Sequence, residues 1–317
     1  MTTQPIKTVG VIGTGVIGAS WTALFLSKGL KVIVTDPAPE AETKLREYLQ
    51  KNCCASDIPD TQARCEPDAC FENLTFVKDI DPYLAQVDLI QENGPERPDV
   101  KRRLFAHLDA ASPEDVVIAS SSSGLPSSTF ITKCTKNPAR ILIGHPFNPP
   151  HLVPLVEVVP HLGTGEEYIA TAYNFYKSLG KDPVVVKQET PGFIANRLQA
   201  AVCAEAYSLI SRGVISAEDL DRTMTSGLGL RWALSGPVIT NALGGGGDFG
   251  HFMDHLGPAL KGWLDDMQTH RFNFDEREKV DKLKGSVNEW VSTINLKEVE
   301  KNRDTFLSSI VRSKQSS

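Results

Sequence analysis

The sequence predicts an α/β domain with a doubly wound sheet, followed by an all-α domain. Strand-like and helix-like segments alternate up to about residue 187, which is typical of a parallel sheet with crossover helices. From Gly192 onward no alternating β-branched run is found, and the segments have helical spacing. A chain of 317 residues is long enough for two domains. We therefore expect one domain over residues 1–190 and another over 191–317.

The first domain is expected to consist of short apolar strands joined by helices. The strands are expected at 8–13, 30–36, 74–77, 87–92, 115–121, 140–145, 154–159 and 182–187. The helices are expected at 16–28, 39–52, 98–109 and 165–180. Gly29 and Gly180 stand where two of these helices end, a position that glycine favours. Residues 53–73 have weak periodicity and are expected to be irregular.

The second domain is expected to be entirely helical. One long helix is predicted over residues 191–213, and a second begins at Ser216, with Asp219 three residues later as in a capping box. The run of glycines at 244–247 predicts an isolated flexible loop. Further helices are expected near 252–268, 276–293 and 297–313.

Composition and charge exclude several classes of function. The net charge is -6 and no long basic block is present, which argues against nucleic acid and membrane surfaces as partners. No apolar run approaches the roughly 20 residues that span a bilayer, and the first residues lack a secretory pattern. The six cysteines have neither paired spacing nor a histidine at zinc spacing, so we expect reduced thiols, a cytoplasmic protein and no metal.

A glycine-rich turn predicts a dinucleotide cofactor. The GxGxxG pattern follows a predicted strand and opens a predicted helix, and Asp36 ends the next strand. This context is that of a Rossmann domain, in which the helix N-terminus holds a pyrophosphate and the acid bonds the ribose hydroxyls. Because a carboxylate repels a 2′-phosphate, NAD is favoured over NADP. The expected cofactor-binding residues of the turn are Gly13, Thr14, Gly15, Val16, Ile17 and Gly18.

A histidine and a glutamate in residues 144–159, GHPFNPPHLVPLVEVV, predict a catalytic pair. An ionised carboxylate among valines is costly unless it is paired. If the two flanking strands are neighbours joined by the proline-rich bend, Glu157 can meet His145. The carboxylate would then orient the imidazole and stabilise its protonated form, which makes it a usable base for an alcohol. The alternative is a structural histidine and an edge-strand acid.

Several motifs along nearly the whole chain resemble the L-3-hydroxyacyl-CoA dehydrogenase family. They include GxGxxG, the acid after the second strand, SSSSGL at 120–125, HPFNP at 145–149, LVEVV at 155–159 and TPGFIANRL at 190–198. The resemblance implies an NAD-dependent dehydrogenase that forms a homodimer through its helical domain, with His145 as acid and base and Glu157 as its partner. It also implies that Ser123 and Asn196 bond the reacting oxygen. By the same resemblance, Asn148 lies near the nicotinamide, and Glu96 and Lys101 contact NAD.

One segment departs from the acyl-CoA enzymes. Residues 227–237, GLGLRWALSGP, are more similar to the L-carnitine 3-dehydrogenase branch and the gulonate 3-dehydrogenase/lambda-crystallin branch, and residues 251–260 favour the former. Those branches act on small free 3-hydroxy acids. Arg231 suits a carboxylate because its guanidinium binds in a bidentate manner, and Trp232 is a further candidate substrate contact. An ion pair between domains is the alternative for Arg231.

Three functions follow from the sequence. The first is oxidation of the 3-hydroxyl of a small 3-hydroxycarboxylic acid to the 3-oxo acid, with a carnitine-like substrate preferred. The second is a 3-hydroxyacyl-CoA dehydrogenase, which would need a basic patch for the CoA phosphates near residues 53–73, where Arg64 is the one cation. The third is a gulonate 3-dehydrogenase or a crystallin-like protein, the latter with a non-catalytic accumulation role. The intact set of Ser123, His145, Glu157 and Asn196 counts against a loss of catalysis.

Overall fold

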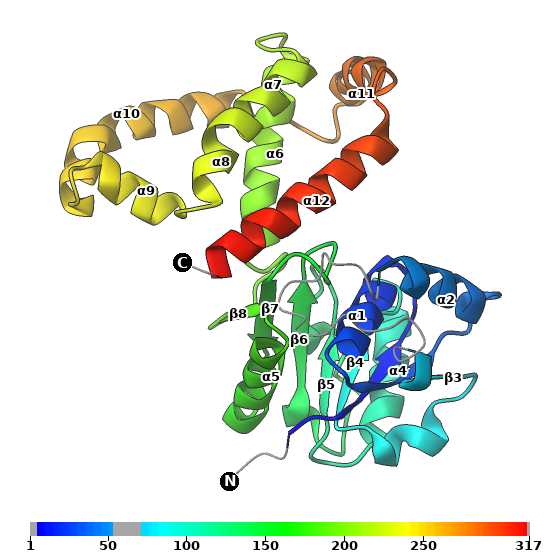
Figure 1. Ribbon diagram of the computed structural model, residues 1–317. Helices are drawn as coiled ribbons and strands as arrows, with labels where there is room; N and C mark the ends of the chain where they lie inside the picture. The colour runs from blue at the N-terminus through cyan, green and yellow to red at the C-terminus, as the bar shows by residue number, and fades with distance from the viewer. Residues whose placement is uncertain (1–4, 53–70, 316–317) are drawn as a thin grey trace. The chain divides into compact units, whose positions relative to one another are not determined.

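A computed structural model of the chain describes residues 5–52 and 71–315 (Figure 1). The described residues form two compact units. The first unit extends to Asn196 and includes the end of the chain from Arg303, and the second contains residues 197–302. Most of the segment predicted to be irregular, 53–73, lies outside the described residues. The predicted division between residues 190 and 191 remains a prediction.

The first unit contains one eight-stranded sheet with the order β3-β2-β1-β4-β5-β6-β7-β8. Neighbouring strands are parallel except β6 and β7, so β7 and β8 run opposite to the others. A parallel pair needs a crossover of roughly a dozen residues or more, and the connection over 147–154 is shorter than that. The strands are β1 (Thr8–Ile12), β2 (Lys31–Thr35), β3 (Leu74–Val77), β4 (Leu89–Glu92), β5 (Val117–Ser120), β6 (Ile141–Pro146), β7 (Leu155–Pro160) and β8 (Asp182–Val185).

Helices cover both faces of this sheet, as the sequence predicts for a doubly wound fold (Figure 1). Side chains of α1, α2 and α5 pack with one set of alternating strand residues, and side chains of α4 pack with the other set. The helices are α1 (Val16–Ser27), α2 (Ala41–Asn52), α4 (Pro98–Ala111) and α5 (Glu166–Ser178). Short 3₁₀ turns are η1 (Asp81–Gln86), η2 (Ser127–Thr129) and η3 (Pro138–Arg140).

The alternation of side chains decides which face carries the predicted catalytic pair. Ile143 and Val159 belong to the core cluster on the α4 side of the sheet. His145 lies two residues after the first, and Glu157 lies two residues before the second, so both project to the same face. The antiparallel register places them directly opposite one another.

The second unit is helical, as predicted. Ser216 is the N-cap of α7, because its hydroxyl accepts a hydrogen bond from the Asp219 amide at 3.0 Å and donates one to Asp219 Oδ2 at 2.9 Å. The prediction of a helix start at residue 191 is wrong: Gly192 and Phe193 have positive φ angles, and α6 begins at Ala195. The sequence also missed α8 and α9 between residues 229 and 244.

The remaining helices are α6 (Ala195–Ser211), α7 (Ala217–Thr223), the π-helical turn η4 (Met224–Leu228), α8 (Gly229–Trp232), α9 (Pro237–Gly244), α10 (Phe249–Thr269), α11 (Arg277–Val291) and α12 (Leu296–Gln315). Helix α9 has no buried residue. Its side chains Val238, Ile239 and Leu243 are each more than half exposed.

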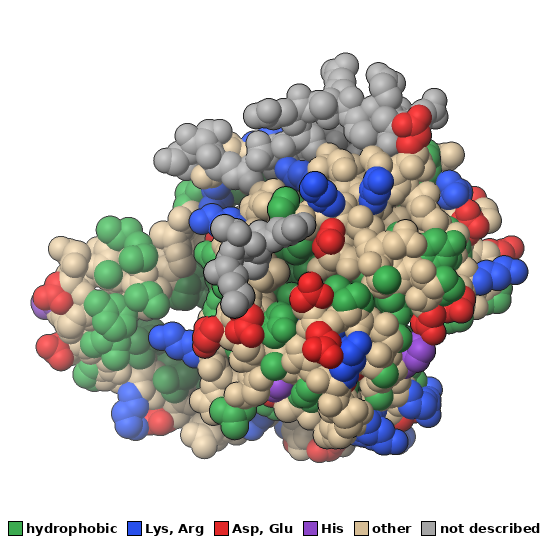
Figure 2. Space-filling model, turned by 90° about the horizontal axis from the view of Figure 1, so that it is seen from below, with side chains coloured by type: hydrophobic (Ala, Val, Ile, Leu, Met, Phe, Trp, Pro, Cys, Tyr) green, Lys and Arg blue, Asp and Glu red, His purple; other side chains and the backbone are tan. Residues whose placement is uncertain are grey.

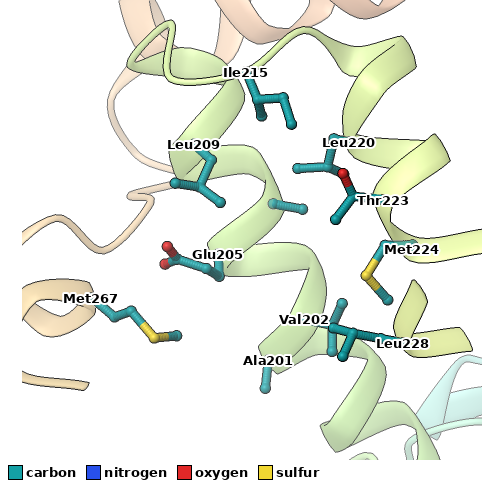
Figure 3. Close-up of a pocket in the computed structure, with 11 residues that line it drawn as sticks. Ala201, Val202, Glu205, Leu209, Ile215, Leu220, Thr223, Met224, Leu228 and Met267 are labelled. Atoms are coloured by element: carbon teal, nitrogen blue, oxygen red, sulfur yellow. The ribbon is translucent and has the colours of Figure 1, made fainter. Parts of the chain in front are cut away.

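An apolar pocket of about 390 Å³ lies within the second unit. Figure 3 shows its side chains around the space between α6 and the segment that follows α6. Leu209, Ile215 and Leu220 lie at one end, and Met224 and Leu228 lie toward the other. The wall is therefore almost entirely hydrocarbon and sulfur, and Glu205 is the charged member of the lining.

The distribution of surface charge and the state of the cysteines agree with what the sequence indicates. On the face in Figure 2, basic and acidic side chains are interspersed rather than separated into large fields of one sign. Cys134 and Cys203 are free thiols, whereas the other four cysteines lie outside the described residues. Across residues 5–52 and 71–315, no helix has the length and apolar content needed to cross a bilayer.

We expect Gly144→Ala to destabilise the first unit by roughly 1–3 kcal/mol, the usual range for overpacking. A methyl group on Gly144 would overlap the buried Tyr176 hydroxyl, which donates to Gln91 Oε1 at 2.7 Å. Urea unfolding followed by circular dichroism measures the change. Gly262→Ala in α10 is the control, because a methyl group there meets nothing within 4 Å, and it should be neutral or stabilising. Equal stability of the Gly144 variant and the native chain would contradict the packing argument.

Candidate active site

The glycine-rich turn lies where β1 meets α1, at the carboxyl edge of the sheet. A side chain at Gly13, where φ is +85°, would approach the Asn93 carbonyl oxygen to 2.8 Å, and one at Gly18 would overlap the Gly13 carbonyl. These two glycines are therefore required by close backbone packing. Gly15 differs, because a side chain there would meet nothing within 4 Å. The chain thus leaves open space in front of the α1 N-terminus.

This turn fits the pyrophosphate of a dinucleotide. No side chain caps the N-terminus of α1, so its first amides remain available to an anion, and the helix dipole favours negative charge there. Strands β2 and β4 flank β1 on opposite sides, so the turn lies at the point where the strand order reverses. Ligands of open α/β sheets bind at such a point.

Asp36 is held in place directly after β2. Its Oδ2 accepts hydrogen bonds from the Thr14 amide at 2.6 Å and the Thr14 hydroxyl at 2.8 Å, and its Oδ1 accepts from the Ala38 amide at 2.8 Å. Partial burial opposes ionisation, but the bonds from Ala38 and Thr14 outweigh it and lower the pKa of Asp36 below 3.8. A fixed negative charge therefore stands beside the glycine turn.

His145 and Glu157 form the buried pair that the sequence predicted. His145 Nδ1 lies 2.8 Å from Glu157 Oε2, and the two residues are 4% and 1% exposed. The rings of Phe147 and Phe193 lie 5.3 and 5.6 Å from the imidazole, centroid to centroid. Among the described residues, Nε2 of His145 has no hydrogen-bond partner. The pair thus has one oriented nitrogen and one that is free to accept a proton.

The second carboxylate oxygen of Glu157 is bonded to the start of α6. Its Oε1 accepts from the amides of Ile194 and Ala195 at 2.9 and 3.0 Å. Burial raises the pKa of Glu157, but the bonds from His145, Ala195 and Ile194 lower it below 4.5. The carboxylate therefore stabilises the fold above about pH 4.5, and this contribution is lost as the pH falls through the lowered pKa.

A strained turn at Phe193 orients the amides of Ile194 and Ala195 toward Glu157. Phe193 has a φ of +50°, which is unfavourable for a bulky side chain, and it is fully buried. Its conformation directs the next two amides at Glu157. The same residue therefore packs against the imidazole and orients the carboxylate. Apart from the glycine that precedes Phe193, no sequence pattern indicates this role.

Ser123 and Asn196 come together beside the pair. Asn196 Nδ2 donates to the Ser123 carbonyl oxygen at 2.6 Å. Glu96 organises the loop of Ser123, because its Oε1 accepts from the amides of Ser123, Gly124 and Leu125 at 3.0 to 3.3 Å. Glu96, which lies just before α4 and is predicted to contact the cofactor, thus also holds the loop that contains Ser123.

Lys101 is buried in an ion pair that the sequence did not suggest. Its Nζ lies 2.9 and 2.7 Å from the two oxygens of Glu92 and 3.3 Å from the Ser120 hydroxyl. Both charged side chains are at most 1% exposed. Because the ammonium is directed at Glu92, it joins the carboxyl ends of β4 and β5. Glu92 is the last residue of β4, whose residues are all buried. In the sequence this segment looks like an ordinary core strand, so the ion pair was not predicted.

The other predicted residues lie outside this cluster of contacts. Asn148 is exposed in the loop after β6. Arg231 and Trp232 belong to α8 of the second unit, and the arginine side chain is exposed. Within residues 5–52 and 71–315, Arg231 forms no ion pair and no side-chain hydrogen bond. The predicted alternative, an ion pair of Arg231 between the domains, stays a prediction.

Comparison with known proteins identifies the family. Residues 8–190 match the model of the 3-hydroxyacyl-CoA dehydrogenase NAD-binding domain, and residues 192–260 match the model of the corresponding C-terminal domain. The chain belongs to the 3-hydroxyacyl-CoA dehydrogenase family. The sequence-based prediction of the family is thereby confirmed, and the protein is an NAD-dependent oxidoreductase of the 3-hydroxy acid type.

Its relatives include two kinds of enzyme. A 3-hydroxyacyl-CoA dehydrogenase of Gibberella moniliformis is 52% identical over 316 residues, covering 99% of this chain and 96% of its own. An L-carnitine dehydrogenase of Streptomyces coelicolor is 43% identical over 259 residues, covering 81% and 80%. The crystal structure of 5-formyl-3-hydroxy-2-methylpyridine 4-carboxylic acid 5-dehydrogenase, an NAD⁺-dependent dismutase, has a TM-score of 0.75 at 26% identity and covers 97% and 98%.

We expect Asp36→Ala to narrow the preference for NAD over NADP, because it removes the fixed charge that opposes a 2′-phosphate. The ratio of kcat/KM values for the two cofactors measures this preference. Asp88→Ala is a matched control, because Asp88 also accepts amide hydrogen bonds, from Lys7 and Thr8, at the opposite end of β1. Equal or better turnover with NADP by the unmodified protein would refute the assignment of Asp36.

We expect His145→Ala to lower kcat by roughly 10²- to 10⁴-fold while NADH still binds, as is typical on loss of a positioned base. Glu157→Gln should cost less activity and move the acid limb of the pH profile to lower pH, because the imidazolium loses its neighbouring charge. Steady-state kinetics across pH 5–10 and a fluorescence titration with NADH give both quantities. An unchanged kcat in either variant would return that residue to a structural role.

Proposed function

We propose that the protein oxidises the 3-hydroxyl of a small free 3-hydroxycarboxylic acid to the 3-oxo acid, with a carnitine-like acid preferred. The observation that carries the proposal is the buried pair in which Glu157 fixes His145 Nδ1 and leaves Nε2 available. A base held in this way suits removal of a proton from an alcohol. A cytoplasmic location belongs to the same proposal and rests on the cysteine pattern.

In the proposed reaction, His145 Nε2 accepts the hydroxyl proton while Glu157 stabilises the resulting imidazolium. Ser123, in the loop after β5, and Asn196 donate hydrogen bonds to the reacting oxygen. NAD, when bound, supplies the acceptor for the hydrogen on the carbinol carbon. The reverse reduction uses the same groups, with the imidazolium returning its proton.

The preference for a free acid rests on Arg231. An exposed guanidinium without a partner in the described residues is available for a carboxylate, which it can bind with two parallel hydrogen bonds. Trp232, the next residue, offers an aromatic face suited to a quaternary ammonium group. The similarity to the L-carnitine dehydrogenase of Streptomyces coelicolor supports this choice.

The second candidate function is oxidation of a 3-hydroxyacyl-CoA. The name of the Gibberella moniliformis relative favours it, because that protein covers nearly the whole chain at 52% identity. The shortage of cations between residues 53 and 73 counts against it, although most of that segment lies outside the described residues. Release of NADH with L-carnitine, gulonate, 3-hydroxybutyrate or 3-hydroxybutyryl-CoA distinguishes these functions and the gulonate alternative.

We expect Arg231→Met to lower kcat/KM for the free acid by roughly 10- to 100-fold, the kinetic equivalent of about 1.5–3 kcal/mol for a charge-assisted bond. Arg231→Lys should restore only part of the loss, because an ammonium cannot form the fork. The affinity for NADH should stay near normal in both variants. If the native protein oxidises 3-hydroxybutyryl-CoA well and no free acid, the assignment fails and the second candidate function holds.

We also propose that the protein is a homodimer formed through its second unit. Large apolar side chains on α9 are more than half exposed, and the pocket of Figure 3 adds hydrocarbon surface to the same unit. Exposed apolar side chains in this number are typical of protein interfaces. Resemblance to the family supports the same assembly.

We expect sedimentation equilibrium to give twice the chain mass of 34.6 kDa. Ile239→Glu should shift the distribution toward the monomer, because it introduces a charge among the exposed apolar side chains of α9. Leu162→Glu is the control, since Leu162 is fully exposed in the first unit. A mass of one chain at high protein concentration would refute the dimer.

A further inference from the structure

Lys181 is a buried basic residue near the candidate active site, and no role has been assigned to it so far. It lies in the turn between α5 and β8 and is 7% exposed. Among the described residues it forms no ion pair with a carboxylate. Burial, assisted by the charge of Lys28, lowers the pKa of its ammonium to about 7. A group that the fold retains against such a penalty must make other interactions that compensate.

Those interactions are hydrogen bonds to the loop that joins β6 and β7. Lys181 Nζ donates to the carbonyl oxygen of Pro150 and, at 2.6 Å, to that of Val153. Buried carbonyls need donors, and the three prolines of this loop, Pro149, Pro150 and Pro154, have no N–H to donate. The neutral amine still has two N–H donors, so both bonds can persist when the ammonium loses its proton.

The same loop is tied to α1 at a second place. The Ser20 hydroxyl of α1 lies 2.9 Å from the His151 amide and 2.8 Å from His151 Nδ1. The next residue of α1, Trp21, has its ring centroid 5.6 Å from Lys181 Nζ. Lys181 and Ser20 therefore fasten one loop to the helix that begins at the glycine-rich turn.

The topology explains why Lys181, the residue just before β8, reaches this loop. Because β7 reverses direction, β8 starts at the edge of the sheet where β6 ends, and Leu155 pairs with Asp182. The loop over 147–154 has His145 just before it and Glu157 just after it. A shift of the loop would move both members of the pair, and Asn148 within it.

We propose that Lys181 is a positioning residue for the dehydrogenase reaction, which holds the loop over 147–154 against α1 so that the catalytic pair and the cofactor turn keep one relative geometry. The proposal rests on membership of the dehydrogenase family. Only its turnover measurement rests on the proposed free-acid substrate. Ser20 of α1 is proposed to have the same positioning role, through its hydrogen bonds to His151 of the loop.

The test compares Lys181→Met, Ser20→Ala and the double variant with the full-length native protein. Asn137→Ala is the control, since it removes hydrogen bonds to Glu114 and Tyr168 near the opposite end of β6. Three quantities are measured: the Kd of NADH by fluorescence, the hydrogen exchange of peptides covering 147–158, and kcat with L-carnitine. The first two need no substrate, so they remain decisive if L-carnitine is not turned over.

Lys181→Met should speed exchange of the loop amides at least tenfold and weaken NADH binding several-fold. It should lower kcat roughly tenfold, because a misplacement of about 1 Å can cost about 10² in rate. Ser20→Ala should change the same quantities in the same direction, and the double variant should lose less than the product of the two single losses, as residues with one shared task do. Asn137→Ala should lower the melting temperature without moving any of the three.

Three results would overturn the proposal. The first is a folded Lys181→Met protein with NADH affinity and loop exchange within twofold of native. The second is an effect no larger than that of Asn137→Ala. The third is strictly multiplicative losses in the double variant. If Lys181→Met does not fold, Ser20→Ala alone decides, by whether it speeds loop exchange and weakens NADH binding.

Discussion

The antiparallel pairing of β6 with β7 is the constraint on which the site depends. It places His145 opposite Glu157 on one face of the sheet, and it reverses β7 so that α6 can begin beside the carboxylate. The hydrogen bonds from His145, Ala195 and Ile194 then keep Glu157 ionised against the effect of burial. A parallel arrangement would have separated the two residues by a crossover. The chemistry therefore follows from one short connection whose prolines prevent it from continuing the strand.

Around this pair, buried polar contacts connect segments that are far apart in the sequence. Glu96 joins the start of α4 to the serine loop, and Asn196 joins that loop to α6. Glu92 and Lys101 form a buried ion pair that connects β4 to α4. Each contact satisfies backbone or charged groups that would be costly to bury alone. The carboxyl edge of the sheet is thus rigid where a dehydrogenase needs fixed distances.

Much of this could be predicted from the sequence, for physical reasons. Alternating apolar strands, glycines at required backbone positions and the capping serine at 216 are local patterns, so they indicated the strands, the cofactor turn and the start of α7. The His145–Glu157 pair was also predictable, because an acid among valines demands a partner. Lys181 was not predictable because its partners lie 28 and 31 residues away, and Phe193 was not because its role depends on a φ angle. Glu92 was missed because it ends an apolar strand, and nothing in that local pattern points to Lys101 nine residues later. Helices α8 and α9 were missed because a glycine-rich segment lacks a clear period.

The left-handed turn at Phe193 has a consequence for how this protein can change. A glycine there would relieve the backbone strain and would be expected to suit the turn better. It would also empty the space beside the imidazole that the phenyl ring fills. Loss of a fully buried phenyl ring costs roughly 3–5 kcal/mol, which exceeds the roughly 1–3 kcal/mol of backbone strain, so stability and the packing of the imidazole both favour phenylalanine at this position. The strained φ angle is therefore retained because one ring fills the core and holds the catalytic histidine at the same time.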